Sequence, residues 1–341
     1  WLSFAKLRLN YARVGNDPLY GRLGAKQNNG SVNNNPIFGN SDQLIEFEKL
    51  RPEITHSWEL GLEASIFKNR LSLDASVYKT NTKDQIFFVP QSPATQYISK
   101  QINAGELENK GIEVALTATP IKTNDFSWQI NVNWSKNVNK LLSLDAGRTN
   151  LLLTTFQRTS LNATVGEPYG TIRGTDYAYD GSGNPVVGDD GLYLQKQDQV
   201  LGNIQPEWIG GVYNKVTYKD LSLSFLINVR EGGSIFSLDQ AYGQETGLYP
   251  ETAGLNDLGN PVRSPLSQGG GIILPGVKED GTPNDIRVDA TASANVFGAD
   301  STPEKAYVYD ASFVKLREVG LTYTMPAKLL GRSFIKGASF S

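Results

Sequence analysis

The chain of 341 residues is long enough for one large β domain or two smaller ones, and its net charge of −3 gives no indication of nucleic-acid binding. It contains no cysteine, which excludes a disulfide framework and a thiolate metal site. The single histidine, His56, leaves little room for histidine-based metal or catalytic-triad chemistry. The sequence contains no run of about 18 apolar residues, so we expect no transmembrane helix. No signal peptide precedes Trp1, and we expect the chain to be a fragment of a longer protein.

Alternation of apolar and polar residues with period two predicts about nine β-strands, most of them paired across short turns. The expected strands lie at 3–14, at 58–66 and 71–77, at 112–119 and 126–135, at 208–218 and 221–229, and from 312 through a turn at 326–332 to a restart at Phe334. A membrane barrel usually has an even number of strands and leaves no edge open, so we expect strands from outside this sequence to complete it.

The hairpin at 112–135 indicates the fold most clearly. Ile112, Val114 and Leu116 alternate with polar or small residues, and the return strand carries Phe126 and Trp134 at the two ends of its apolar face. These aromatic residues are roughly 26 Å apart along a strand at about 3.3 Å per residue. That length, tilted, approaches the apolar band of about 25 Å of an outer-membrane strand. We expect the turn at 120–125 to lie on the periplasmic side.

Short and long connections between the expected strands alternate along the chain. Those after Phe67, Thr119 and Tyr218 are short, whereas segments 15–55, 141–205 and 231–305 are long and rich in Gly, Asn, Asp, Ser and Pro, with a middling one at 88–103. Long loops without strand signals are uncommon in soluble domains. Outer-membrane barrels have short periplasmic turns and long extracellular loops. The pattern predicts an all-β transmembrane antiparallel β-barrel; the alternative is a soluble all-β binding or adhesion protein, such as a sandwich or propeller.

Aromatic residues near strand ends are candidates for the two membrane interfaces, where aromatic girdles flank the apolar band. They are Trp58, Phe67, Phe126, Trp134, Trp208 and Tyr218, although Phe67 falls out of phase at its turn. The alternative is that these side chains fill the core of a soluble sandwich.

Six tyrosines in the expected extracellular loops are candidates for stacking on sugar rings or peptide side chains. They are Tyr169, Tyr177, Tyr179, Tyr193, Tyr242 and Tyr249. The alternative is ordinary packing between long loops.

No catalytic residue, cofactor or metal site is expected. Asp180, Ser182 and Asn184 alternate as in a calcium loop, but Gly191 stands where the closing carboxylate belongs, and turn chemistry also explains these residues. Glu106 and Glu108 would share one face of a strand and Glu113 the other. A β-rich glycosidase is therefore a further alternative, with polar lumen or rim charge as the simpler interpretation.

Five blocks resemble, in order, the SusC/RagA-type TonB-dependent transporters of Bacteroidetes outer membranes. They include PEITHSWELGLE at 52–63 within block 50–86, NKGIE at 109–113 within block 103–144, VGEPYGTIRG at 165–174, GNIQPEWIGGV at 202–212, and DASFVKLREVGLTYT at 310–324 within block 310–330. Together the blocks cover roughly a third of the chain and are spread over most of its length.

The resemblance implies a barrel of about 22 strands filled by an N-terminal plug. Residues 1–341 would be its C-terminal portion, with the plug domain and TonB box not present. The full protein would import oligosaccharides or peptides with energy relayed by TonB, beneath a SusD-like lid lipoprotein. It would sit in the bacterial outer membrane, with its strands against membrane lipids and no enzymatic activity.

Overall fold

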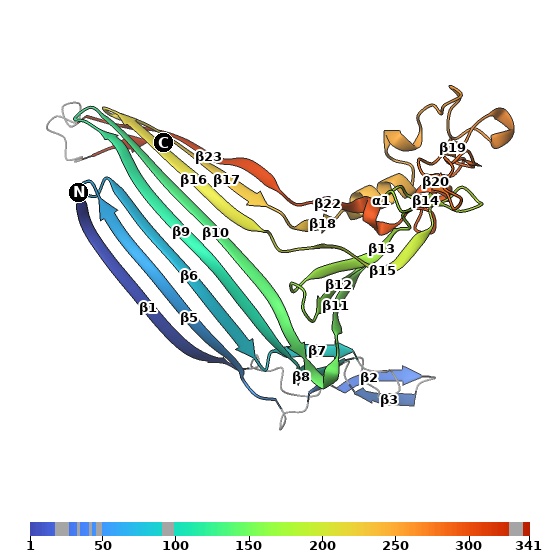
Figure 1. Ribbon diagram of the computed structural model, residues 1–341, viewed down its shortest axis with the longest axis horizontal. Helices are drawn as coiled ribbons and strands as arrows, with labels where there is room; N and C mark the ends of the chain where they lie inside the picture. The colour runs from blue at the N-terminus through green and yellow to red at the C-terminus, as the bar shows by residue number, and fades with distance from the viewer. Residues whose placement is uncertain (18–26, 33–34, 41–42, 46–49, 91–98, 327–336) are drawn as a thin grey trace.

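The computed structural model describes residues 1–17, 27–32, 35–40, 43–45, 50–90, 99–326 and 337–341. Its main body is a nine-stranded sheet with strand order β1-β5-β6-β9-β10-β16-β17-β23-β24, curved into a wall (Figure 1). All neighbouring strands in it are antiparallel. The strands are β1 (Leu2–Asn16), β5 (Glu53–Ile66), β6 (Leu71–Lys83), β9 (Gly105–Lys122), β10 (Phe126–Leu144), β16 (Trp208–Tyr218), β17 (Leu221–Glu231), β23 (Phe313–Thr324) and β24 (Ser339–Phe340).

The predicted strand number and the first three hairpins are confirmed, although β9 and β10 extend beyond the predicted 112–119 and 126–135. β9 continues to Lys122, so the turn expected at 120–125 is confined to 123–125, where Thr123 Oγ1 accepts a hydrogen bond from Phe126 N at 2.9 Å. The turn expected at 326–332 and the restart at Phe334 lie largely outside the described residues. At the turn after β5, Phe67, Lys68 and Asn69 have φ of 54°, 56° and 64°, which takes Phe67 out of the strand alternation.

The register gives the wall two distinct faces. One row of directly paired residues runs Leu7, Leu62, Ala75, Val114, Trp134, Gly210, Val229, Val314. The adjacent row runs Lys6, Glu63, Asp74, Ala115, Asn133, Gly211, Asn228, Lys315. Since side chains alternate along a strand, every apolar position of the first row lies on one face of the sheet and every position of the second on the other.

The apolar face is not covered by other parts of the described chain. Leu7 is 72% exposed and Leu321 57% exposed, although they lie on strands near opposite edges of the sheet. Apolar side chains exposed in a continuous row are typical of a lipid-facing surface, since water would not favour them. None of the helices in the described ranges is both long and apolar enough to cross a membrane.

The long connections are folded, which the sequence did not indicate. Residues 145–205 form a second sheet, with strand order β11-β12-β13-β15. Its strands are β11 (Asn150–Phe156), β12 (Thr159–Thr164), β13 (Thr171–Tyr177) and β15 (Gln195–Asn203). Residues 231–310 hold α1 (Leu238–Glu245), α2 (Ala294–Phe297) and a 3-10 turn at Glu304–Tyr307. Residues 145–205 and 231–310 are called the loop module below; they lie at the end of the wall away from its short turns (Figure 1).

Short strand pairs complete the described chain. They are β2 (Gln27–Val32) with β3 (Asn35–Asn40), β4 (Gln43–Ile45) and β7 (Ile86–Pro90) on either side of β8 (Ser99–Asn103), β14 (Val186–Val187) with β20 (Val277–Lys278), β18 (Ser234–Phe236) with β22 (Val308–Asp310), and β19 (Ile272–Ile273) with β21 (Arg287–Val288). Buried apolar clusters lie at the loop end: one joins Phe87 and Leu141 to Leu151, and another centres on Val296 in the loop module.

Candidate functional site

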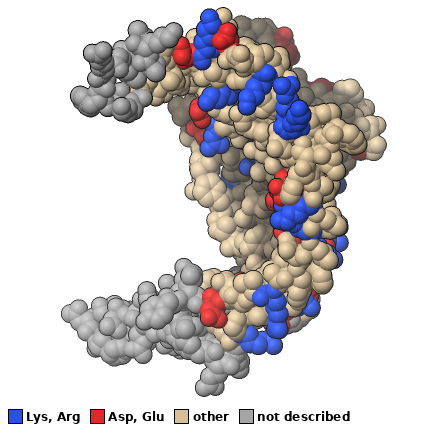
Figure 2. Space-filling model, turned by 90° about the vertical axis from the view of Figure 1, so that its left-hand side faces the viewer, with Lys and Arg blue, Asp and Glu red and all other residues tan. Residues whose placement is uncertain are grey.

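The polar face of the wall is concave and forms a hollow of about 650 Å³. Figure 2, which views the chain from the side of the short turns, shows the wall as an open arch hollowed on one side. The charged and amide side chains that line the hollow come from β1, β5, β6, β9, β10 and β17: Arg8, Glu59, Asp74, Glu113, Asn133 and Asn228. A polar concave face opposite an apolar outer face is the arrangement of a water-filled barrel lumen.

Arg8 joins three strands across this hollow. Its Nη2 donates to Asp74 Oδ1 at 2.6 Å, and its Nη1 donates to Asp74 Oδ2 at 3.2 Å and Glu63 Oε2 at 3.4 Å. Gly61 is paired with Arg8, and a Cβ at that position would lie 3.0 Å from the guanidinium nitrogens. The missing side chain on β5 is therefore what lets Arg8 reach β6.

A series of amide side chains connects the inner face of the wall to the loop module. The Tyr78 hydroxyl donates to Asn137 Oδ1 at 3.0 Å, and Asn137 and Asn139 both donate to Asn109 Oδ1, at 3.2 and 2.7 Å. Asn139 Oδ1 accepts from the backbone N–H of Tyr169 at 2.8 Å. The chain of contacts joins the wall to the segment between β12 and β13 of the second sheet.

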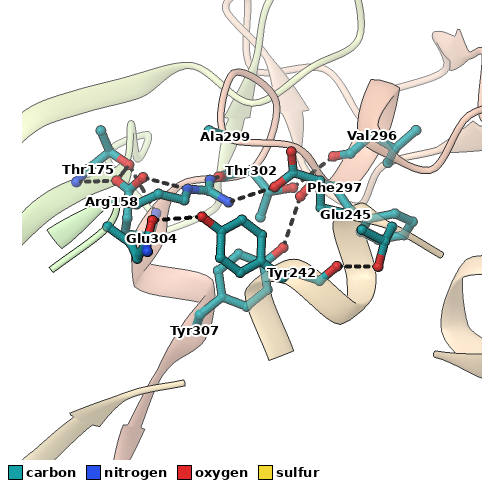
Figure 3. Close-up of polar contacts among 12 residues, drawn as sticks. Arg158, Thr175, Tyr242, Glu245, Val296, Phe297, Ala299, Thr302, Glu304 and Tyr307 are labelled. Atoms are coloured by element: carbon teal, nitrogen blue, oxygen red, sulfur yellow. Dashed lines mark hydrogen bonds and ion pairs between the residues drawn. The ribbon is translucent and has the colours of Figure 1, made fainter. Parts of the chain in front are cut away.

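A buried ion pair holds the two parts of the loop module together (Figure 3). Arg158 Nε lies 3.1 Å from Glu304 Oε1, and the side chains are only 10% and 6% exposed. The other carboxylate oxygen of Glu304 accepts from the backbone N–H of Thr175 at 2.7 Å and from its hydroxyl. Arg158 also donates to the carbonyl of Thr302 at 2.8 Å and lies over the ring of Tyr307, 5.7 Å from its centroid.

Three of the six candidate tyrosines come together. Tyr177 and Tyr193 make an edge contact with centroids 4.8 Å apart, and Tyr179 lies 6.0 Å from Tyr177. With Pro185 and Pro275 they line a cavity of about 560 Å³ between residues 177–193 and 275–283. Burial raises the pKa of Tyr177 and of Tyr193, so both phenols stay neutral well above physiological pH. The cavity offers flat apolar surfaces and neutral hydroxyls, of which that of Tyr193 donates to the Pro275 carbonyl at 3.1 Å and that of Tyr179 to Asp176 at 3.2 Å.

The other three tyrosines lie elsewhere. Tyr169 stacks against Phe87 at 6.2 Å and packs on the cluster where the loop module meets the wall. The Tyr242 hydroxyl donates to Gln157 at 2.8 Å, and the Tyr249 hydroxyl donates to Asp239. Each of these contacts is within the protein, as ordinary packing between loops would require.

The candidate interface aromatics occupy the two ends of the apolar face. Phe126 and Tyr218 are directly paired beside the short turns, and Trp134 and Trp208 both approach Gly210 further along the strands. Trp58 is 55% exposed and contacts the ring of Tyr11 at 4.6 Å; Phe67 is likewise exposed, in its turn. Their contact with the membrane interfaces stays a prediction.

The carboxylates considered for calcium or for catalysis have other partners. Asp180 accepts hydrogen bonds from the side-chain amide of Asn184 at 3.0 Å and from the backbone N–H groups of Asn184 and Ser182, both at 2.8 Å. These bonds lower its pKa and close a turn. Glu108 pairs with Lys79 at 2.8 Å and Glu106 with Lys83 at 3.9 Å. Glu113 lines the hollow on the opposite face. Within the described residues, no three His, Cys, Asp or Glu side chains are placed to hold a metal ion.

Sequence reasoning missed the ion pairs of Arg8 and of Arg158. Arg158 and Glu304 are 146 positions apart, and no local pattern links them. Once the hairpins are assigned, the alternation along each strand places Arg8, Glu63 and Asp74 on the polar face. The face of each residue could therefore be predicted from the sequence, although the ion pairs could not.

Comparison with known proteins agrees with this geometry. The family described as "TonB dependent receptor-like, beta-barrel" matches residues 1–244. TonB-dependent receptor P26 of Formosa agariphila is 27% identical, and the match covers 98% of this chain and 34% of P26. TonB-dependent receptor SusC of Bacteroides thetaiotaomicron is 24% identical, and the match covers 64% of this chain and 24% of SusC. The solved structure of the RagAB peptide transporter has a TM-score of 0.72 with 21% identity, covering 99% of this chain and 36% of that one.

The chain spans about a third of the length of P26 and of a second Formosa agariphila receptor, P3, which it matches at 26% identity. The expected resemblance to SusC and RagA is confirmed, as is the barrel fold of the fragment. The soluble sandwich or propeller is set aside, because the strands form one curved sheet with an uncovered apolar outer face. The chain belongs to the TonB-dependent receptor-like β-barrel family and is part of a bacterial outer-membrane protein.

Proposed function

We propose that the full-length protein is an outer-membrane importer of oligosaccharides or peptides. Its energy would come from TonB, and a SusD-like surface lipoprotein would act as its lid. The observation that carries the proposal is the two-faced wall, with a continuous apolar outer row and a concave inner face lined by Arg8, Asp74 and Glu113. A wall of this kind separates lipid from a wet passage, and it breaks no bond in what passes. The related structure named RagAB is a peptide transporter, and SusC is a second relative, so both cargo classes stay within the proposal.

The loop module supports a role in cargo capture. It is held together by Arg158 and Glu304 and anchored to the wall through Asn139, so its surface is organised before any ligand arrives. A preorganised surface loses less conformational entropy on binding. In this proposal the cavity of Tyr177, Tyr179 and Tyr193 contacts the cargo through ring faces and neutral hydroxyls.

Uptake in cells tests the importer. Cells that carry the full-length protein are given fluorescent neutral oligosaccharides or fluorescent peptides, and the same assay is run after deletion of TonB. The proposal expects uptake of one class that is lost without TonB. Uptake of neither class, or uptake that persists without TonB, would refute it.

The cavity is tested separately with Tyr177→Ala combined with Tyr193→Ala. The expected result is an increase in the Kd for the transported class of about tenfold, since aromatic stacking contributes about 0.5–1.5 kcal/mol per contact. Tyr249→Ala is the matched control, because Tyr249 lies in the loop module outside the cavity and contacts Asp239 instead. Equal loss in the control would assign the effect to loop folding.

Purification of the intact protein without a lipoprotein partner would contradict the proposed lid.

A further inference from the structure

We propose that the unpaired edge of β10 at Asn137 and Asn139, here called the open edge, binds a short extended peptide as an added β-strand. The inference rests on the proposed import function and narrows its cargo to peptides. The site lies where the wall meets the loop module, apart from the hollow and from the tyrosine cavity.

The strand β10 loses its partner on one side well before it ends. Its ladder with β16 stops at the pair of Ser135 with Ile209, whereas its ladder with β9 continues to Leu144. Beyond the Ser135 pair, β10 and the chain that leads into β16 diverge (Figure 1). The upper part of β10 is therefore an edge of the sheet within the wall.

The segment across the gap does not pair with the open edge. The N–H of Ile204 donates to the Gly170 carbonyl at 3.2 Å, and the N–H of Glu207 donates to the Glu231 carbonyl at 2.8 Å. Pro206, next to Glu207, has no N–H to donate. The main chain of this segment is thus directed to the loop module and to β17 instead of β10.

Strand geometry directs the main-chain N–H and C=O groups of Asn137 and Asn139 into the gap. On the same side of β10, the Asp125 carbonyl accepts a hydrogen bond from the residue after β16, and the Leu141 N–H donates to the loop module at 3.0 Å. Every second residue of an antiparallel strand bonds to the same side, so Asn137 and Asn139 point there too. Among the described residues, no main-chain hydrogen bond fills these four groups on that side.

A cavity of about 360 Å³ lies along the open edge, and its size is typical of small-ligand sites. The unpaired stretch between Ser135 and Leu141 covers six residue steps, or roughly 20 Å at about 3.3 Å per residue. A peptide of a few residues fits that length. The side chains that line the cavity are apolar, amide and oppositely charged, and include Val138, Pro168, Gln205, Lys136 and Glu207.

The spacing of the free groups selects a peptide rather than a sugar. Asn137 and Asn139 are two residues apart, so their donor and acceptor pairs repeat at roughly 6.6 Å. An extended peptide carries N–H and C=O groups at the same repeat and can add to an exposed sheet edge. Both asparagine side chains also donate to Asn109, at 3.2 and 2.7 Å, so the open edge is held in place before a peptide arrives.

Fluorescence anisotropy of the purified full-length protein in detergent tests the proposal without a transport step. The probe is a pool of capped, dye-labelled peptides of seven residues and randomised sequence. The comparison pool is methylated at every backbone nitrogen and has no main-chain donors. We expect the Kd to be at least about tenfold higher for the methylated pool, since each main-chain hydrogen bond contributes about threefold to tenfold.

The variant Asn137→Pro tests the protein side of the contact. Proline removes the N–H that faces the cavity, at an edge position where strands tolerate it. Asn137→Ala is the matched control, because it loses the same side chain and keeps the N–H. The Kd of the unmethylated pool should be about threefold to tenfold higher for Asn137→Pro than for Asn137→Ala.

Hydrogen–deuterium exchange on the parent protein gives a second measurement, which decides the matter if Asn137→Pro does not fold. The N–H groups of Asn137 and Asn139 should exchange fast without peptide and become protected when the pool is bound. Three results would overturn the proposal: equal binding of the methylated pool, equal Kd values for two folded variants, or protection of both groups before peptide is added. The last would show that another segment of the full-length protein fills the open edge. Uptake of oligosaccharides by a protein that binds no peptide would overturn the open edge as a site and leave the importer standing.

Discussion

Replacement of Glu304 by glutamine should open the loop module while it leaves the wall intact. The substitution keeps the shape of the side chain but removes the charge that faces Arg158 Nε at 3.1 Å, and it turns an amide N–H₂ toward groups that already donate. Loss of one partner of a buried ion pair costs about 3–5 kcal/mol. We take the lower figure, because Arg158 keeps its hydrogen bond of 2.8 Å to the Thr302 carbonyl.

The assay is hydrogen–deuterium exchange on the full-length protein in detergent. A loss of about 3 kcal/mol in local stability corresponds to roughly 100-fold faster exchange where reclosing is fast and the opening equilibrium sets the rate. We expect that acceleration over β13, whose Thr175 N–H donates to Glu304 at 2.7 Å, and no change over β10 in the wall. Glu245→Gln is the control: Glu245 is 31% exposed and lies 3.8 Å from Arg158, so its loss should cost about 1 kcal/mol at most. Unchanged exchange over β13 in Glu304→Gln would refute the reasoning, as would equal acceleration in the wall.

Three further outcomes follow from the same contacts. Burial raises the pKa of Tyr307 from 10.0 to about 12, so its contribution to loop-module stability is complete below pH 10 and is lost as pH rises through 12. Tyrosinate absorbance and circular dichroism should show an alkaline step that Tyr307→Phe reduces but does not abolish, because burial also raises the pKa of Tyr177 and Tyr193. Gly111→Ala should destabilise the wall by about 1–3 kcal/mol in heat-shift electrophoresis, since its Cβ would lie 2.5 Å from the Lys136 carbonyl, whereas Gly181→Ala, in open space, should not. Leu116→Arg should cost about 2–4 kcal/mol in urea unfolding from lipid vesicles while its neighbour Thr117→Arg, on the inner face, costs far less; equal effects would contradict the assignment of faces.

The wall was predictable because its information is local. Alternation with period two fixes both the strand and the face of each residue, so Val114 and Trp134 could be assigned to one surface before their direct pairing was known. Phe67 departs from that rule because the turn holds it at a φ of 54°. Alternation of apolar and polar residues therefore does not predict the face of a residue in a turn, where the backbone conformation sets the direction of the side chain.

The loop module was not predictable in the same way. Its second sheet uses short strands such as β12 and β13, and its stability depends on contacts like Arg158 with Glu304, 146 positions apart. The composition of these segments indicates only turns. Tyrosine content pointed to Tyr177 and Tyr193, which do meet, but equally to Tyr169, which packs beneath the loops.

The contacts also give the wall and the loop module different resistance to opening. Strands of the wall are joined by complete ladders and by Arg8, which spans from β1 to β6, so separating them would break many hydrogen bonds at once. The loop module has ladders of its own, but its strands are shorter than most of those in the wall, and its segments 145–205 and 231–310 are joined by side-chain contacts such as the Arg158 ion pair. Regions with fewer stabilising contacts open at lower free energy. Opening within the described chain is therefore expected in the loop module before the wall, which is why Glu304, and not a wall residue, is the position where a single substitution should alter opening alone.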